Sequence, residues 1–296
     1  MSVLDLSNLT PPDLIEDLDY EACFEEMRDR LVANDDSFTA LTESDPVYKI
    51  LEVAAYFRIL DRQRVNEAAL AVMIAYAAKD DLDQVGARFK VTRLTVTAAD
   101  DSTTPPTPAV MEDDDSFRDR IQLAMEGMSV AGPVNAYVYH AKSADARVAD
   151  VTAISPTAGQ ALITVLSSEE DGTASQDILD NVETALNAED VRPLCDEVVV
   201  QSAKIVEYGI EATLYLSSGP ESEPILKKAA ENAASYAASQ RRLGRNIRRS
   251  AITSALHVSG VEYVKLNSPA EDIIISKEQA GYCSGGIVTN YGGEDE

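Results

Sequence analysis

Apolar positions at helical spacing dominate the first third of the chain. Between Asp19 and Val32 the apolar side chains fall three or four residues apart, which predicts one helix with a single apolar stripe. That stripe consists of Tyr20, Cys23, Phe24, Met27 and Leu31. The same spacing returns after Asp45 and continues to Tyr76 without another proline or glycine after Pro46. We therefore expect a helical region over residues 1–97.

The second of these helices is predicted to be unusually long. Asp45 suits an N-cap, and Pro46 suits the first helical turn. About thirty residues at about 1.5 Å rise each would reach roughly 50 Å, more than a small domain needs. A helix of this length with an alanine-rich second half packs against other long helices, in the same chain or in a partner. Its candidate interface residues are Ile50, Val53, Phe57, Leu60 and Arg64.

Residues 98–116 interrupt the periodic pattern. Proline, threonine and aspartate crowd together there, which predicts a solvated linker. Asp113, Asp114 and Asp115 raise the alternative of a divalent-metal loop. The calcium-loop pattern needs alternating ligands, a central glycine and a distal glutamate, and none of these falls in place. We expect the aspartates to cap a helix that begins near Phe117, and we assign no metal site.

After residue 117 the pattern alternates between helical and extended segments. Their order, αββα–ββααββ, predicts two small α+β modules with helices on one face of each antiparallel sheet. We place these modules at residues 117–203 and 204–276, followed by a glycine-rich, irregular tail at residues 277–296. The predicted fold class is therefore α+β: a helical N-terminal region with a long helix, then two small modules.

The stretch SVAGPVNAYVYHA raises the question of a catalytic elbow, because it places His140 beside a Gly-Pro break. His140 lies in an apolar helix and His257 near a helix C-terminus, which favours packing and capping roles for both. Serine-hydrolase elbows and phosphate-binding glycine motifs do not occur, and the three cysteines form no CxxC pair. We therefore assign no catalytic residue and no cofactor. Gly132 and Pro133 are predicted to form a module hinge.

The charge of the chain limits its partners. It carries 25 basic and 51 acidic residues, a formal net charge of −26. A field of that sign repels nucleic acid and anionic lipid, so we expect neither as a partner. No apolar run is long enough to cross a bilayer, and the acidic N-terminus does not resemble a secretory signal. These features predict a protein that is made and used, or assembled, in a cytoplasm.

One basic patch opposes this charge. It consists of Arg241, Arg242, Arg245, Arg248 and Arg249. Nucleic-acid contact is disfavoured because no aromatic residue is interleaved and the surrounding field is negative. Guanidinium groups pair well with carboxylates, and the chain's own surface is rich in them, so a contact between subunits is attractive. A solvated helix junction is the alternative that remains open.

Five stretches, in this order, resemble one family. They are ESDPVYKILEVAAYFRILDRQRVNEAALAVMIAYA, DLDQVGARFKVTRL, DDSFRDRIQLAMEGMSVAGPVNAYVYHAKSAD, VRPLCDEVVVQSA and LGRNIRRSAITSALHVSGVEYVKLNSPAEDI. The family is that of the baseplate J-like wedge proteins of contractile-tailed phages and phage tail-like bacteriocins, and the resemblance is greatest to members from P2-like phages. It extends from residue 11 to the C-terminus. Lys90 departs from the pattern, because a glycine is expected there.

The resemblance implies a structural protein and not an enzyme. Such proteins build wedges in a ring around the central hub, two copies joining one copy of a tail protein I-like subunit. It also implies contacts with neighbouring wedges and with other baseplate and sheath-initiating proteins. The expected location is the virion tail baseplate, assembled in the host bacterial cytoplasm. A hydrolytic enzyme acting on the host cell envelope is the alternative from another functional class.

Overall fold

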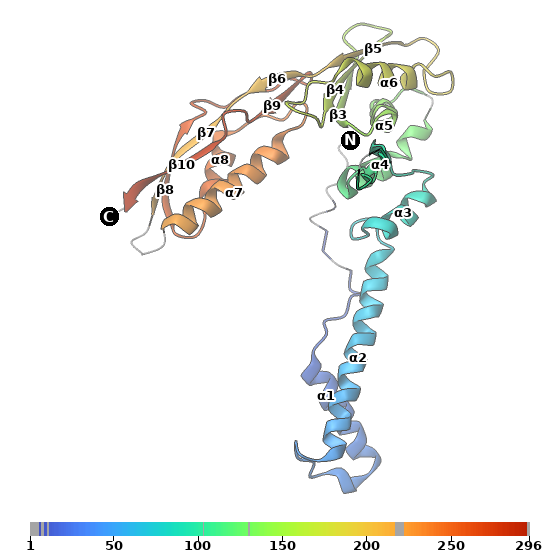
Figure 1. The fold of residues 1–296 in the computed structure, drawn as a ribbon, viewed down its shortest axis with the longest axis vertical. Coiled ribbons are helices and arrows are strands. Elements are labelled where there is room, and N and C mark those ends of the chain that lie inside the picture. The colour runs from blue at the N-terminus through green and yellow to red at the C-terminus, as the bar shows by residue number, and fades with distance from the viewer. Residues whose placement is uncertain are drawn as a thin grey trace. The chain divides into compact units, whose positions relative to one another are not determined.

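In the N-terminal unit, residues 2–92, the elements of the described residues are all helical (Figure 1). The computed structural model describes residues 6, 9–10, 12–102, 104–129, 131–216 and 222–294. The elements of this unit are α1 (Tyr20–Asn34), the 3-10 turn η2 (Asp36–Phe38), α2 (Pro46–Ala71) and α3 (Lys79–Arg88).

Helix α1 packs on the first half of α2, as its apolar stripe predicts. Asp19 caps α1, since its side chain accepts hydrogen bonds from the backbone N–H groups of Glu21 (2.9 Å) and Ala22 (3.3 Å). The buried centre of the pair consists of Cys23, Phe24 and Ala55, with Met27, Tyr48, Leu51 and Ile59 packed around it. This small core leaves most of the α2 surface uncovered.

Helix α2 begins as predicted, with Asp45 at the N-cap and Pro46 in the first turn. It has 26 residues, so its length is roughly 39 Å. The helical spacing predicted a continuation to Tyr76, and that prediction was wrong. Beyond Ala71 the chain tightens into a turn in which the N–H of Met73 bonds to the carbonyl of Leu70 (3.0 Å). The turn lets the Tyr76 hydroxyl donate to the carbonyl of Leu9 (2.6 Å).

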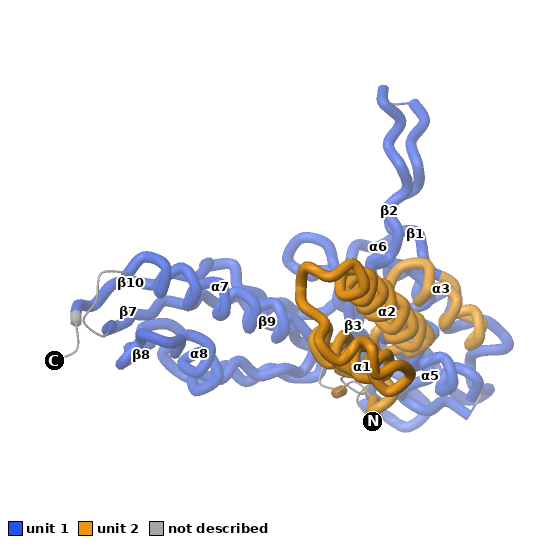
Figure 2. The backbone as a smooth tube through the Cα atoms, turned by 90° about the horizontal axis from the view of Figure 1, so that it is seen from below, with its two compact units in different colours: residues 1, 93–296 blue, residues 2–92 orange. Residues whose placement is uncertain are grey.

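Residues 93–296 form a second unit, which is α+β. It starts with an arm, residues 95–111, in which β1 (Thr95–Thr97) and β2 (Val110–Met111) pair antiparallel. Further out, Asp100 and Thr107 exchange both backbone hydrogen bonds at 2.9 Å. Figure 2 shows the two strands of this arm leaving the rest of the unit. Residues 98–116 were predicted to form a solvated linker; those described up to Met111 are exposed, but cross-strand pairing orders part of them, and the segment from Asp114 belongs to the next helix.

Helix α4 (Asp114–Leu123) follows the arm directly. Asp113 caps it, accepting hydrogen bonds from the backbone N–H groups of Asp115 and Ser116, both at 3.0 Å. The predicted capping role of the aspartates is confirmed, although the helix starts three residues before Phe117. The ring of Phe117 is fully buried, so the first turn of α4 is fixed in the body of the unit.

A three-stranded sheet with the order β3-β4-β5 forms the central module. Its elements are η3 (Glu126–Met128), α5 (Val134–Ala144), β3 (Val148–Ile154), β4 (Gln160–Ser167), α6 (Gln176–Leu186) and β5 (Glu197–Ser202). Strands β3 and β4 are antiparallel, whereas β4 and β5 are parallel and α6 forms the crossover between them. Apolar side chains of α5 and α6 pack with those of the sheet to form one core.

The C-terminal module repeats this scheme with the sheet order β10-β7-β8. Its elements are β6 (Lys204–Glu207), β7 (Ile210–Leu216), α7 (Ser222–Gln240), α8 (Arg249–Leu256), β8 (Val261–Ser268), β9 (Gln279–Tyr282) and β10 (Ile287–Glu294). Along β7, Ile210, Ala212, Leu214 and Leu216 alternate inward and pack with α7 and α8 (Figure 1). The predicted α+β class is confirmed, and both three-stranded sheets contain a parallel pair besides the predicted antiparallel one.

Residues 277–296 do not form the irregular tail that their glycine content predicted. Within the described part, β9 pairs parallel with β6 and β10 pairs parallel with β7. A Cβ atom on Gly285 would lie only 2.9 Å from Cα of Gly209. The glycines therefore allow two connections to pass at backbone contact distance, which places the last strand beside the sheet centre.

The two modules share a small apolar junction. Strand β6 continues β5 after Ala203, and Leu166, Ala203, Leu243 and Ala280 are buried together. The backbone N–H of Leu243 donates to the Asp150 carboxylate (2.9 Å), and the Thr152 hydroxyl donates to the carbonyl of Lys277 (2.6 Å). The central and C-terminal modules are thus fastened together within the α+β unit.

Candidate interaction surfaces

An apolar stripe runs along α2 on the side that faces away from α1. Its members Ile50, Val53, Phe57 and Leu60 are between 40% and 67% exposed. Together with Arg64 they lie alternately three and four residues apart, which is the a/d spacing of a helix seam. We call these five residues the α2 stripe.

Helix geometry places the α2 stripe opposite the packed face. Ala55 is fully buried against α1, and Phe57 follows it by two residues. At roughly 100° per residue, Phe57 therefore points about 160–200° away from Ala55. Tyr56 is also exposed, and its ring centroid lies 5.6 Å from that of Phe57. Sequence reasoning missed Tyr56 because it is adjacent to Phe57 and lies outside a spacing of three or four residues.

The packed face of α2 stays covered beyond the end of α1. There the segment before α1 covers it. Arg62 Nε donates a hydrogen bond to the Glu16 carboxylate (2.6 Å). The Asn66 side chain accepts one from the N–H of Glu16 (3.1 Å) and donates one to its carbonyl (2.9 Å). One side of α2 is thus used inside the chain, and the α2 stripe remains available to a partner.

Three arginines of the basic patch are used inside the α+β unit. Arg241 donates to the carbonyls of Glu169 (3.3 Å) and Glu170 (2.7 Å), and its guanidinium lies 5.2 Å from the centre of the Tyr282 ring. Arg248 pairs with the Asp272 carboxylate at 2.8 Å. Arg249 donates to the carbonyls of Pro269 and Leu266.

The other two arginines are presented to solvent. Arg242 and Arg245 are exposed, and their side chains have no hydrogen bond or ion pair to any residue that the structure describes. The structure thereby divides the predicted interface residues of this patch into three that hold the loop and two that a partner can reach.

Both histidines have structural contacts. His140 Nε2 lies 3.1 Å from the carbonyl of Gly127, and its ring packs edge-on against Tyr139. His257 is the C-cap of α8, with its backbone N–H on the carbonyl of Thr253 (3.0 Å). In the described ranges no hydrogen bond links either ring to a carboxylate, serine or cysteine, and no cluster of metal-ligating side chains occurs.

Gly132 and Pro133 lie directly before α5, with Pro133 as its N-cap. Gly132 has a φ of +76°, and a Cβ atom there would lie 2.9 Å from Cγ of Pro193. Close by, Tyr137 donates a hydrogen bond of 2.6 Å to the Asp196 carboxylate, and burial together with that bond raises the pKa of Tyr137 above its ordinary value. This junction inside the central module is closely packed; its role as a hinge stays a prediction.

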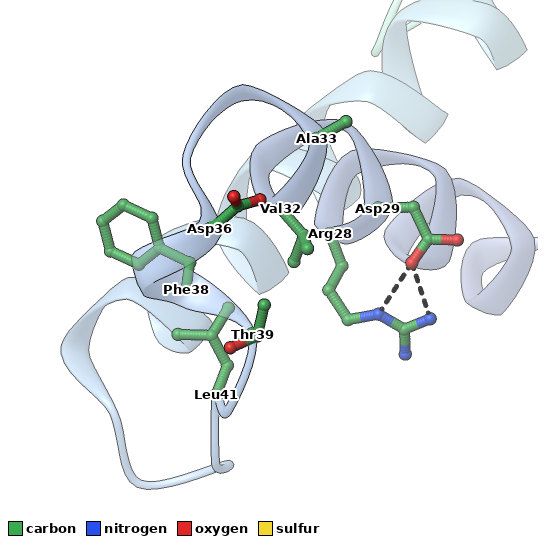
Figure 3. Close-up of a pocket in the computed structure, with 8 residues that line it drawn as sticks. All are labelled: Arg28, Asp29, Val32, Ala33, Asp36, Phe38, Thr39 and Leu41. Atoms are coloured by element: carbon green, nitrogen blue, oxygen red, sulfur yellow. Dashed lines mark hydrogen bonds and ion pairs between the residues drawn. The ribbon is translucent and has the colours of Figure 1, made fainter.

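A pocket of about 580 Å³ lies beside the end of α1 (Figure 3). Val32, Phe38 and Leu41 give it an apolar part, and Arg28 holds Asp29 at its rim through hydrogen bonds of 2.9 and 3.1 Å. Such a mixture of apolar and charged groups suits contact with a protein side chain better than cofactor binding.

Three family models match the chain. The baseplate J-like N-terminal domain matches residues 43–100, the baseplate J-like central domain residues 129–202, and the baseplate J-like protein C-terminal domain residues 208–288. The chain belongs to the baseplate J-like protein family. In this baseplate J-like chain, the N-terminal match contains α2 with its stripe, and the C-terminal match extends through β9 into β10.

Two known proteins are similar to this baseplate J-like chain. It is 52% identical over 303 residues to baseplate protein J of Escherichia phage P2, with both chains covered completely. A cryo-EM structure of the anti-feeding prophage baseplate, 6-fold symmetrised, aligns with 92% of the chain at 11% identity and a TM-score of 0.32. The chain spans 56% of the length of that solved chain. Within the described ranges, no helix is long and apolar enough to cross a membrane.

Proposed function

We propose that the chain is a structural component of a phage-tail baseplate, in which it serves as a wedge subunit of the ring around the central hub. The exposed α2 stripe carries this proposal. It is a helix seam that stays exposed among the described residues, on a chain of the baseplate J-like family. The proposed location is the tail baseplate of a virion or tail-like particle, assembled in the cytoplasm of the host bacterium.

The energetics favour a helical partner on the α2 stripe. Full burial of one exposed aliphatic or aromatic side chain contributes about 1.5–3 kcal/mol. The four side chains are 40–67% exposed, so covering each adds roughly half of that, and together they offset part of the cost of association. A stripe of that length and spacing fits a second copy of this chain together with a tail protein I-like subunit. Neighbouring wedges and other baseplate and sheath-initiating proteins are the further partners that we propose for the remaining surfaces.

Co-expression with the tail protein I-like subunit tests this function. We expect native mass spectrometry to find a complex with two copies of this chain. Phe57→Glu should weaken that complex at least tenfold, because it places a charge in the apolar seam. Since Phe57 is 59% exposed, the free chain should keep its fold.

Val65→Glu is the matched control. Val65 is on the same helix and 67% exposed, but it points roughly 80° away from Phe57. We expect this variant to assemble normally. Separate chains in the wild-type experiment would contradict the wedge function, whereas equal damage by both variants would contradict only the assignment of the stripe.

A further inference from the structure

The arm, residues 95–111, has no core of its own. Each of its described residues is exposed, including Val96, Val110 and Met111. Its sheet consists of β1 and β2 alone, so both outer edges keep unpaired backbone groups. An isolated two-stranded hairpin is marginally stable in water, which means that this arm depends on its root or on a partner.

The root of the arm is held by a buried ion pair. Arg120 binds the Glu112 carboxylate through Nε (2.8 Å) and a terminal nitrogen (2.6 Å), and both side chains are at least 95% buried. The same carboxylate accepts the N–H of Leu94 (3.1 Å), and the N–H of Glu112 donates to the carbonyl of Leu94 (2.9 Å). Both ends of the arm are therefore fixed, so its direction is set before any partner binds.

The charge of the arm has one sign. Asp100 and Asp101 are its only charged side chains, and prolines at positions 105, 106 and 108 follow them. The prolines remove backbone donors and so oppose strand pairing near the tip. At the tip the Asp100 carboxylate accepts hydrogen bonds from the N–H (2.9 Å) and the hydroxyl (2.5 Å) of Ser102, which hold it in place beside Asp101. The tip thus presents two exposed carboxylates, and the strands nearer the root present apolar side chains.

A basic loop, residues 241–248, has the complementary character. Arg242 and Arg245 are exposed to solvent. Leu243 lies between them, Ile247 follows them, and both are buried. The backbone of Leu243 forms a β-bridge with Ala280, and that of Ile247 forms one with Ile273. The contacts of Arg241 and Arg248 hold the two ends of the loop. The loop therefore presents two guanidinium groups on a fixed backbone, which lowers the entropy cost of binding.

We propose that the arm of one copy docks on the basic loop of a neighbouring copy, with Asp100 and Asp101 against Arg242 and Arg245. A chain with a net charge of −26 repels its copies, so a contact at which opposite charges meet is favoured. No ion pair joins these four side chains within the described part of a single chain. Different surfaces of the two copies meet in this contact, and such a heterologous contact builds a ring when the rotation between successive copies closes. This inference rests on the proposed ring assembly.

Charge reversal in the full-length chain, co-expressed with the tail protein I-like subunit, tests the docking. We expect the double variants D100R/D101R and R242D/R245D each to reduce assembly of wedges into rings at least tenfold in sedimentation velocity. The loss should shrink at high salt, which screens an exposed charge contact. All four positions are exposed, so the melting temperature of each variant should stay near that of the wild type.

Two further combinations of variants test whether the contact lies between copies. A chain that carries all four reversals should form rings again. A mixture of the two double variants should also form rings, in which the two variants alternate, because the arm and the loop of one variant carry charges opposite to the loop and the arm of the other. The matched control is E189R/D190R, an equal charge change at an exposed acidic pair, which should assemble like the wild type.

The outcomes separate this docking from the wedge function. If the complex with the tail protein I-like subunit never forms, the proposed wedge function is contradicted, and with it the ring assembly on which the docking rests. If wedges and rings form but reversal has no effect, or the fourfold variant is not restored, the docking proposal is overturned. It is also overturned if D100R/D101R releases the tail protein I-like subunit, because the arm then binds that subunit.

Discussion

At the scale of single residues, partners decide what a charged side chain does. Glu112 and Arg120 are buried together, and every oxygen of the carboxylate accepts a hydrogen bond. Asp115 forms a single contact of 2.7 Å with Arg118, and its side chain is 94% exposed. Water screens the second pair, so only the first should matter for stability.

Glu112→Gln should lower the free energy of unfolding by about 3–5 kcal/mol, because it leaves the Arg120 guanidinium buried without its counter-charge. Asp115→Asn should change that free energy by less than about 1 kcal/mol. Urea unfolding followed by circular dichroism would measure both. A Glu112→Gln variant as stable as the wild type would show that the pair does not hold the root of the arm.

At the scale of elements, short connections fix how helices and strands meet. Gly132 has a φ of +76° and Gly286 a φ of +71°, yet their surroundings differ. A Cβ on Gly132 would meet Pro193, whereas nothing lies within 4 Å of a Cβ on Gly286. Alanine substitution at the two positions therefore distinguishes the cost of a left-handed backbone from the cost of steric crowding.

Gly286→Ala should lose about 1 kcal/mol of stability, since only the left-handed backbone opposes the methyl group. Gly132→Ala should lose about 1–3 kcal/mol more, because the methyl group also displaces the loop that carries Pro193. Thermal unfolding of the two variants compares them directly. Equal losses would mean that the turn before α5 is loosely packed, which would favour its predicted role as a hinge.

At the scale of the whole molecule, Arg241 fastens the central module to the C-terminal one. Its two hydrogen bonds reach carbonyls after β4, and its guanidinium lies over the ring of Tyr282 in β9. Arg242 is next to it in sequence but exposed. Neighbouring arginines thus differ in role: Arg241 holds the two modules together, and Arg242 is exposed to solvent.

Arg241→Met keeps the apolar stem but removes the charged hydrogen bonds, which are worth about 1.5–3 kcal/mol. We expect faster amide hydrogen exchange in β6 and β9, with little change in the helical unit. Arg242→Met is the control and should leave exchange in both strands unchanged. Unaltered exchange in Arg241→Met would show that the apolar junction alone joins the modules.

The sequence by itself determined the features that depend on near neighbours. The spacing of apolar residues predicted α1 and the α2 stripe, Pro46 marked the start of α2, and Asp113 was recognised as a cap. These outcomes follow from side-chain period and backbone hydrogen bonding within a few residues. The resemblance of several segments to a known family was readable for the same reason, because it depends only on residues in order.

Only the tertiary structure decided the features that join distant parts of the chain. Residues 98–111 form part of an ordered arm because Glu112 meets Arg120, and the glycine-rich end becomes a strand because β7 supplies its partner. The five arginines of the patch differ only in which carbonyls and carboxylates the fold brings to them. Such contacts leave no local period in the sequence, since their energy comes from groups that folding alone places together.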